Sequence, residues 1–181
     1  MARIVETIFK GLYLIEPRVF GDERGYFCET MNTSWKGIVF PDFVQDNESY
    51  SAYGVVRGLH FQRGSSAQAK LVSVAEGRVW DVVVDLRPDQ PTFGKHFGVE
   101  LSRENHLRLL IPRGFAHGFS VLSDRALFQY KCDNYYNPSA EDGIAWDDPD
   151  LAIDWKIPSS DVMLSDKDCK HQSFKDYLKK I

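Results

Sequence analysis

Short runs of apolar and aromatic residues, separated by Gly, Pro and Asp, recur along the whole chain and predict short β-strands. Two of these runs flank a Glu-Gly pair at 76–77, which is typical of a tight hairpin turn. We expect strands over residues 12–16, 26–31, 43–45, 55–62, 70–75, 78–86, 97–101, 107–111, 117–122 and 126–134.

The run 78–86 shows the clearest alternation of side chains. Successive residues of a strand point to opposite faces. Trp80, Val82 and Val84 therefore share one face, and Asp81 and Asp85 lie on the other. Val79 and Val83 share the face of the two acidic residues.

Helical periodicity is sparse. Residues 33–37 predict one turn, and residues 173–180 predict a short C-terminal helix with Ser173 as its N-cap. Many short strands with frequent turns indicate an all-β domain, either a sandwich or a jelly roll, and the pattern alone does not choose between them. We expect one domain over residues 1–181 with short peripheral helices.

Composition narrows the class of protein. Hydrophobic residues make up 43% of the chain, so we expect it to fold, and the net charge of -4 argues against a general nucleic-acid binder. No apolar run is long enough to span a membrane, and residues 1–6 lack the apolar core of a signal peptide.

The three cysteines, Cys28, Cys132 and Cys169, are scattered and odd in number, so they do not indicate a set of disulfide bonds. We therefore expect a cytoplasmic protein with reduced thiols.

The stretch 111–119 contains Pro112, Gly114 and His117 in a Pro-x-Gly-x-x-His arrangement that resembles the second motif of the cupins. The comparable first motif contains His60, but Gln62 stands where a metal-binding cupin has a second histidine. A carboxamide is a poor substitute for imidazole as a transition-metal ligand. We therefore expect no metal, and the chain has no Gly-rich dinucleotide loop that would indicate a redox cofactor.

The run Arg-Gly-Leu-His-Phe-Gln at 57–62 is more specific. Together with other segments it resembles the dTDP-4-dehydrorhamnose 3,5-epimerase family. The matching stretches occur in family order, at 20–27, 45–47, 57–62, 69–72, 81–87, 91–94, 114–119, 130–138 and 164–168. The resemblance implies a cupin-type jelly-roll barrel and an isomerase. Its reaction converts dTDP-4-dehydro-6-deoxy-D-glucose to dTDP-4-dehydro-L-rhamnose by epimerisation at C3 and C5.

The resemblance also implies catalytic roles for four residues. A proton on carbon beside a ketone is acidic because the resulting carbanion becomes an enolate, so the reaction needs a base, an acid and a group that stabilises the enolate oxygen. His60 matches the base and Asp168 its orienting partner. Tyr130 matches the proton donor, on the same strand face as Cys132, and Lys70 matches the residue at the ketone oxygen.

Substrate binding is implied for a larger set: Arg24, Glu29, Gln45, Asp46, Asn47, Arg57, Lys70, His117, Glu141 and Lys167. Within that set Arg57 poses a problem. Arg57 and His60 are three residues apart, so a regular strand would point them to opposite faces. A bulge at Gly58 would bring them together, and the sequence leaves this open.

Three alternatives to the double epimerase remain at this stage. A single-site enzyme, acting at C3 only or C5 only, would keep the same residues. A metal-dependent cupin would need a bound metal, and a non-catalytic sugar-binding jelly roll would need neither His60 nor Tyr130 chemistry. The resemblance further implies a homodimer, in which residues 21–29 reach the partner's site and cover an open sheet edge.

Overall fold

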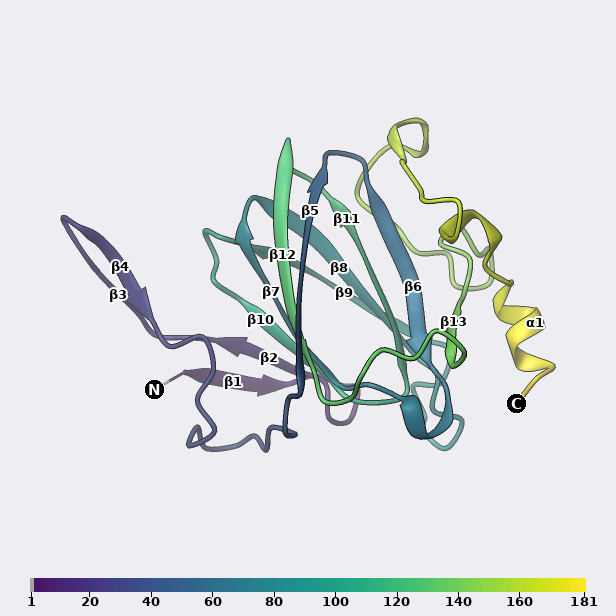
Figure 1. Ribbon diagram of the computed structural model, residues 1–181, viewed down its shortest axis with the longest axis horizontal. Coiled ribbons are helices and arrows are strands. Elements are labelled where there is room, and N and C mark those ends of the chain that lie inside the picture. The colour runs from purple at the N-terminus through teal and green to yellow at the C-terminus, as the bar shows by residue number, and fades with distance from the viewer. Residues whose placement is uncertain (1) are drawn as a thin grey trace.

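The computed structural model describes residues 2–181, and strands make up most of its regular secondary structure (Figure 1). The strands are β1 (Arg3–Glu6), β2 (Tyr13–Glu16), β3 (Val19–Asp22), β4 (Gly25–Cys28), β5 (Gln45–Ala52), β6 (Val56–Gln62), β7 (Lys70–Glu76), β8 (Arg78–Asp85), β9 (His96–Ser102), β10 (Arg108–Ile111), β11 (Phe115–Val121), β12 (Arg125–Cys132) and β13 (Glu141–Gly143). The helices are α1 (Phe174–Leu178) and three 3-10 turns, η1 (Gly64–Ser66), η2 (Ser159–Asp161) and η3 (Asp168–Lys170).

Two antiparallel sheets face each other. One has the strand order β1-β2-β10-β7-β12-β5 and the other β13-β6-β11-β8-β9. The hairpin β3–β4 belongs to neither, and it projects away from the barrel at the left of Figure 1. The all-β, cupin-type jelly roll implied by the resemblance is confirmed.

The main core lies between the sheets. Phe119 of β11 and Phe128 of β12 stack there with ring centroids 4.3 Å apart, and Val79 and Val83 of β8 pack into the same cluster. The opposite face of β8 is also covered, because the C-terminal segment packs against it through Trp155 and other residues. The alternation predicted for this strand is confirmed, and both of its faces are buried.

Strand β5 is much longer than predicted. We expected residues 43–45, whereas the strand runs from Gln45 to Ala52. Its sequence, Gln-Asp-Asn-Glu-Ser-Tyr-Ser-Ala, has polar residues on both faces, because the inward face borders a polar cavity. A strand that is polar on both sides lacks the apolar alternation by which strands are recognised. Strands β1, β3 and β13 were missed as well.

Of the two helical predictions, only the one for the C-terminal segment is confirmed. Residues 33–37 form isolated turns and no helix. The C-terminal helix is confirmed as α1, and the Ser173 hydroxyl accepts a hydrogen bond from the Asp176 N–H at 3.1 Å, as expected of an N-cap. No helix among residues 2–181 has the length and apolar character needed to cross a membrane.

A bulge in β6 settles the orientation of Arg57. His60 lies opposite His117 of β11, and Arg57 lies opposite Phe119, so three steps along β6 match two steps along β11. His117 and Phe119 share one face of their strand, and Arg57 and His60 therefore share a face too. Gly58 has a φ of +118° here. A Cβ at Gly58 would lie 2.6 Å from the Gly118 Cα, which explains why this position is glycine.

Candidate active site

A cavity of about 320 Å³ opens between the two sheets at one end of the barrel. Strand β6 and its neighbour β13 line it from one sheet, and β5, β7 and β12 line it from the other. The lining residues are Gln45, Asn47, His60, Phe61, Gln62, Gln68, Lys70, Tyr130, Cys132, Tyr136 and Glu141. Six of these were predicted site residues: Gln45, Asn47, His60, Lys70, Tyr130 and Glu141.

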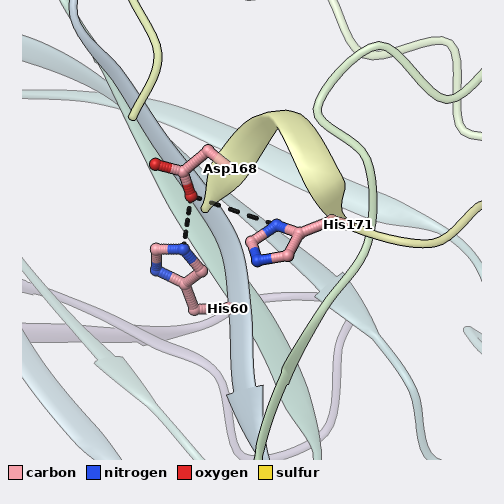
Figure 2. Close-up of side chains that lie close together, drawn as sticks. All are labelled: His60, Asp168 and His171. Carbon is pink, nitrogen blue, oxygen red and sulfur yellow. Dashed lines mark hydrogen bonds and ion pairs between the residues drawn. The ribbon is translucent and has the colours of Figure 1, made fainter. Parts of the chain in front are cut away.

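His60 is paired with a buried carboxylate. Its Nε2 lies 2.6 Å from Asp168 Oδ1, and the pair is drawn in Figure 2. Asp168 Oδ2 accepts a hydrogen bond from the Ser165 hydroxyl at 2.6 Å. Burial by itself would raise the pKa of Asp168, but hydrogen bonds from His60 and Ser165 and the charge of His60 lower that pKa to about 2. Asp168 therefore stays ionised, and it holds His60 through Nε2, while Nδ1 has no hydrogen-bond partner among residues 2–181.

Tyr130 and Lys70 belong to the sheet that faces His60. The Lys70 ammonium lies 5.6 Å from the centroid of the Tyr130 ring. Burial raises the pKa of the Tyr130 phenol above its ordinary value, so this phenol stays protonated at neutral pH. Burial also lowers the pKa of Lys70, although the neighbouring Cys132, Asp81 and Glu141 oppose that effect. A lysine of this kind gives up its proton more readily than one in water.

Polar side chains form one wall of the cavity. Gln45 Nε2 donates to Asn47 Oδ1 at 2.9 Å, so the two amides share one face of β5. Across the opening, the Tyr136 hydroxyl donates to Glu141 Oε2 at 2.6 Å, and Lys167 forms an ion pair with the same carboxylate. These hydrogen bonds, donated by Lys167 and Tyr136, hold the pKa of Glu141 below its ordinary value, although burial opposes them.

Arg57 and His117 also point between the sheets without lining the cavity. His117 Nε2 lies 2.8 Å from Asp81 Oδ2, and its ring stacks on Phe128 at 5.9 Å. Arg57 donates from Nε to the Ser51 hydroxyl at 3.2 Å. Asp81, which is fully buried in β8, is therefore the partner of His117.

Three predicted binding residues lie elsewhere in the chain. Arg24 pairs with Asp22 on the projecting hairpin, and Glu29 accepts a hydrogen bond from Asn32 just after it. Asp46 points to the outer face of its sheet, where it pairs with Lys131 at 2.8 Å. The structure does not bring these three residues to the cavity of their own chain. Side chains alternate between the two faces of β5, so the Asp46 side chain points away from the face that carries Gln45 and Asn47.

Several residues at the site were not among those predicted. Cys132 was noted only as sharing a strand face with Tyr130, and that periodicity would have placed it at the cavity. His171 was not singled out at all. Its ring lies edge-to-face against His60, with centroids 5.1 Å apart, and its Nδ1 lies 3.9 Å from Asp168 Oδ1 (Figure 2). No sequence motif marks His171. It lies directly after η3 and reaches His60 only because η3 packs against the barrel.

The residues at the positions of the cupin metal ligands do not form a metal site here. Gln62, at the position of the second histidine, uses its amide to hold neighbouring loops. Its Nε2 donates to Ser66 O at 2.7 Å and to Tyr135 O at 3.2 Å, and its Oε1 accepts from Asn137 N at 2.6 Å. With these bonds in place the Gln62 carboxamide has a structural role. His117 is likewise engaged by Asp81.

A jelly-roll barrel whose cavity holds a His–Asp pair opposite a tyrosine and a lysine defines an acid–base isomerase of the cupin type. The family model described as dTDP-4-dehydrorhamnose 3,5-epimerase matches residues 6–176. The chain belongs to this family.

Individual relatives agree with the family model. The chain is 52% identical to dTDP-4-dehydrorhamnose 3,5-epimerase of Escherichia coli (strain K12) over 168 residues, covering 91% of this chain and 90% of that one. A crystal structure of dTDP-4-dehydrorhamnose 3,5-epimerase from Elizabethkingia anophelis NUHP1 superposes with a TM-score of 0.90 at 56% identity, over 97% of both chains. A structure from Legionella pneumophila Philadelphia 1, in complex with dTDP-4-keto-L-rhamnose, gives a TM-score of 0.90 at 47% identity, over 97% of this chain and 94% of that one.

Proposed function

We propose that this protein converts dTDP-4-dehydro-6-deoxy-D-glucose to dTDP-4-dehydro-L-rhamnose by epimerisation at C5 and C3. The observation that carries this proposal is the arrangement of the cavity, in which His60 comes from one sheet and Tyr130 from the other. A sugar ring between the sheets would present opposite faces to the two side chains. Inversion of a carbon requires that its proton leave one face and return to the other.

His60 acts as the base. Asp168 accepts the Nε2–H bond, and the lone pair of Nδ1 is then free to take a proton from the carbon beside the C4 ketone. The electron pair of the C–H bond moves to the C4 oxygen and forms an enolate. Lys70 stabilises the charge that develops on this oxygen. Asp168 in turn stabilises the imidazolium that His60 becomes.

Tyr130 returns the proton. Its phenol is neutral because its pKa is raised, and it delivers a proton to the opposite face of the enolate carbon. The His60 imidazolium then loses its proton to solvent, and the Tyr130 phenolate regains one from solvent. The pair is restored and acts again at the second carbon, which lies on the other side of the same ketone.

The polar residues near His60 and Tyr130 bind the nucleotide. Asn47 and Gln45 offer amide donors and acceptors at the cavity wall, and Lys167 and Arg57 supply positive charge for a diphosphate. His117 would act from within the barrel, beside Arg57. Glu141 holds Lys167 in place through their ion pair.

We propose a homodimer as the working unit. The hairpin β3–β4 projects from the barrel (Figure 1). It exposes Phe20 and Phe27, the latter at 65%. Exposed aromatic side chains on a projecting hairpin favour burial against another surface. Strand β5 lies at an open sheet edge beside the cavity. Docking of the hairpin there would carry Arg24 and Glu29 to the partner's substrate.

We further propose that the enzyme works in the cytoplasm without a metal or a redox cofactor. The hydrogen bonds of the Gln62 carboxamide to neighbouring loops support the absence of a metal. Cys28, Cys132 and Cys169 are all free, which suits a reducing compartment. We expect that prolonged treatment with a chelator does not lower turnover.

Incubation with dTDP-4-keto-6-deoxyglucose in heavy water tests the function directly. Each inverted carbon acquires one deuteron, so the double epimerase gives a product with two deuterons, detected by mass spectrometry and assigned by NMR. One deuteron, at C3 or at C5, would establish the single-site alternative. No deuterium and no epimer would contradict the proposal and favour a non-catalytic binding protein.

A further inference from the structure

His171 carries a buried nitrogen that the proposed reaction does not use. Its side chain is 9% exposed, and its Nδ1 has no hydrogen-bond partner among residues 2–181. This atom points toward Asp168, as Figure 2 shows. A buried polar atom without a partner is costly, and its presence in a native structure calls for an explanation.

The surroundings of this nitrogen form a set of metal ligands. Nitrogen atoms of His60 and His171 and an oxygen of Asp168 all lie within 4.8 Å of one another. Two imidazoles and one carboxylate are a ligand set typical of zinc. Zinc bonds of about 2.0–2.2 Å would place the three ligand atoms a little over 3 Å apart, so small side-chain movements suffice.

Hydrogen-bond donors that would hold the Asp168 carboxylate in place as a ligand are already present. The Ser165 hydroxyl donates to the other oxygen of Asp168 at 2.6 Å, and the Gly58 N–H lies 3.4 Å from Oδ1. Contacts of this kind orient a ligating carboxylate and raise metal affinity. The His60 side chain is 28% exposed and lines the cavity, which gives an ion a path to the cluster.

We propose that His60, Asp168 and His171 bind a zinc ion that inhibits the enzyme. Zinc on His60 Nε2 takes the place of the proton between His60 and Asp168. A neutral imidazole bound to metal through Nε2 must carry its proton on Nδ1, the atom that would otherwise accept the substrate proton. The base is thereby lost, and removal of the zinc restores it.

This site differs from that of the metal-binding cupins. The cupin ligands would be His60, the residue at position 62 and His117, all inside the barrel, and Gln62 and His117 have other partners. Asp168 and His171 instead come from η3 and the residue after it. His171 is the one ligand without a role in the proposed reaction, and it is therefore the residue to change.

Binding is tested first, without substrate. Zinc titrated into the chelator-treated protein is expected to bind saturably, one ion per chain, by calorimetry. His171→Phe keeps an aromatic ring in the space beside Gly143 and removes the ligand, and it should weaken binding about tenfold or more. His96→Phe, the same change at an exposed histidine outside the cluster, should bind zinc like the wild type. X-ray absorption of the zinc-loaded wild type should show only nitrogen and oxygen ligands.

Inhibition is tested second, and only this part rests on the proposed function of His60. Zinc should abolish epimerisation by the wild type and by His96→Phe over the same concentrations at which it binds, and chelator should reverse the loss. His171→Phe should remain active at those concentrations.

Absence of saturable binding, a sulfur ligand in the absorption spectrum, or equal affinity in His171→Phe would overturn the zinc site. Binding to the wild type without loss of activity would overturn its inhibitory role. If the protein had no activity on the dTDP sugar, the proposed function would fail while the binding result stood.

Discussion

His60 and Tyr130 line the cavity from different sheets, and the proposed mechanism gives them separate steps. Tyr130→Phe removes only the proton delivered to the second face. The enolate still forms, and His60 can return the proton to the face from which it came. We expect deuterium incorporation from heavy water to continue while epimer formation falls by about 10²- to 10⁴-fold. Mass spectrometry gives the deuterium content, and NMR gives the configuration.

Two companion variants make this result interpretable. His60→Ala should abolish both exchange and epimerisation, because no enolate forms without the base. Lys70→Ala should lower both rates together, because both pass through the enolate that we propose Lys70 stabilises. Epimerisation by Tyr130→Phe at the wild-type rate would show that another acid serves. Tyr136, which also lines the cavity, would then be the next residue to change.

At the level of elements, the bulge in β6 determines whether Arg57 and His60 share a face. A Cβ at Gly58 would meet the Gly118 Cα at 2.6 Å and the His117 carbonyl oxygen at 2.7 Å, besides the cost of a positive φ. We expect Gly58→Ala to destabilise the protein by about 3 kcal/mol, measured by denaturant unfolding, and to reduce activity.

Gly37→Ala is the matched control for this variant. Gly37 also has a positive φ, of +89°, but no atom in the described part of the chain would lie within 4 Å of an added Cβ. The substitution should cost about 1 kcal/mol, and activity should remain. Equal costs for the two variants would mean that the close approach of β11 to Gly58 is unimportant.

The end of β8 predicts a pH dependence of stability. Burial would raise the pKa of Asp85, but hydrogen bonds from Arg87 and Thr92 outweigh it and hold this pKa below its ordinary value. The folded state therefore binds a proton less readily than the unfolded chain. Asp85 contributes stability above the unfolded pKa of about 4, and this contribution is lost as pH falls through the folded pKa.

Asp85→Asn isolates that contribution. The variant leaves Arg87 without its charged partner, so we expect it to lose about 3 kcal/mol at pH 7. Its free energy of unfolding should also fall less steeply than that of the wild type as the solution is acidified below pH 4. Parallel pH profiles for the two proteins would contradict the assignment.

At the scale of the whole molecule, the hairpin β3–β4 predicts that each cavity is completed by a second chain. Arg24→Ala and His60→Ala should each be nearly inactive alone. When the two chains are co-expressed, half of the dimers are mixed and each has one intact site. About a quarter of the wild-type activity should then return. If each cavity uses only its own Arg24, mixing restores nothing, and sedimentation showing only monomer would also contradict the dimer.

Several features follow from the sequence alone. The apolar runs predicted an all-β domain and most of its strands, because alternation in strands such as β8 reflects burial directly. The ordered motifs indicated the family, since a catalytic set must keep its residue types in order along the chain. Gln62 in place of histidine already argued against the cupin metal site.

Other features were decided only by tertiary structure. The shared face of Arg57 and His60 depends on how β6 pairs with β11, and the course of β5 depends on the polar cavity that its inward face borders. His171 reaches the His60–Asp168 pair because η3 packs against β6 across more than a hundred residues of chain. A local pattern records which face of a strand is apolar, whereas such contacts depend on which distant segments meet when the core is packed.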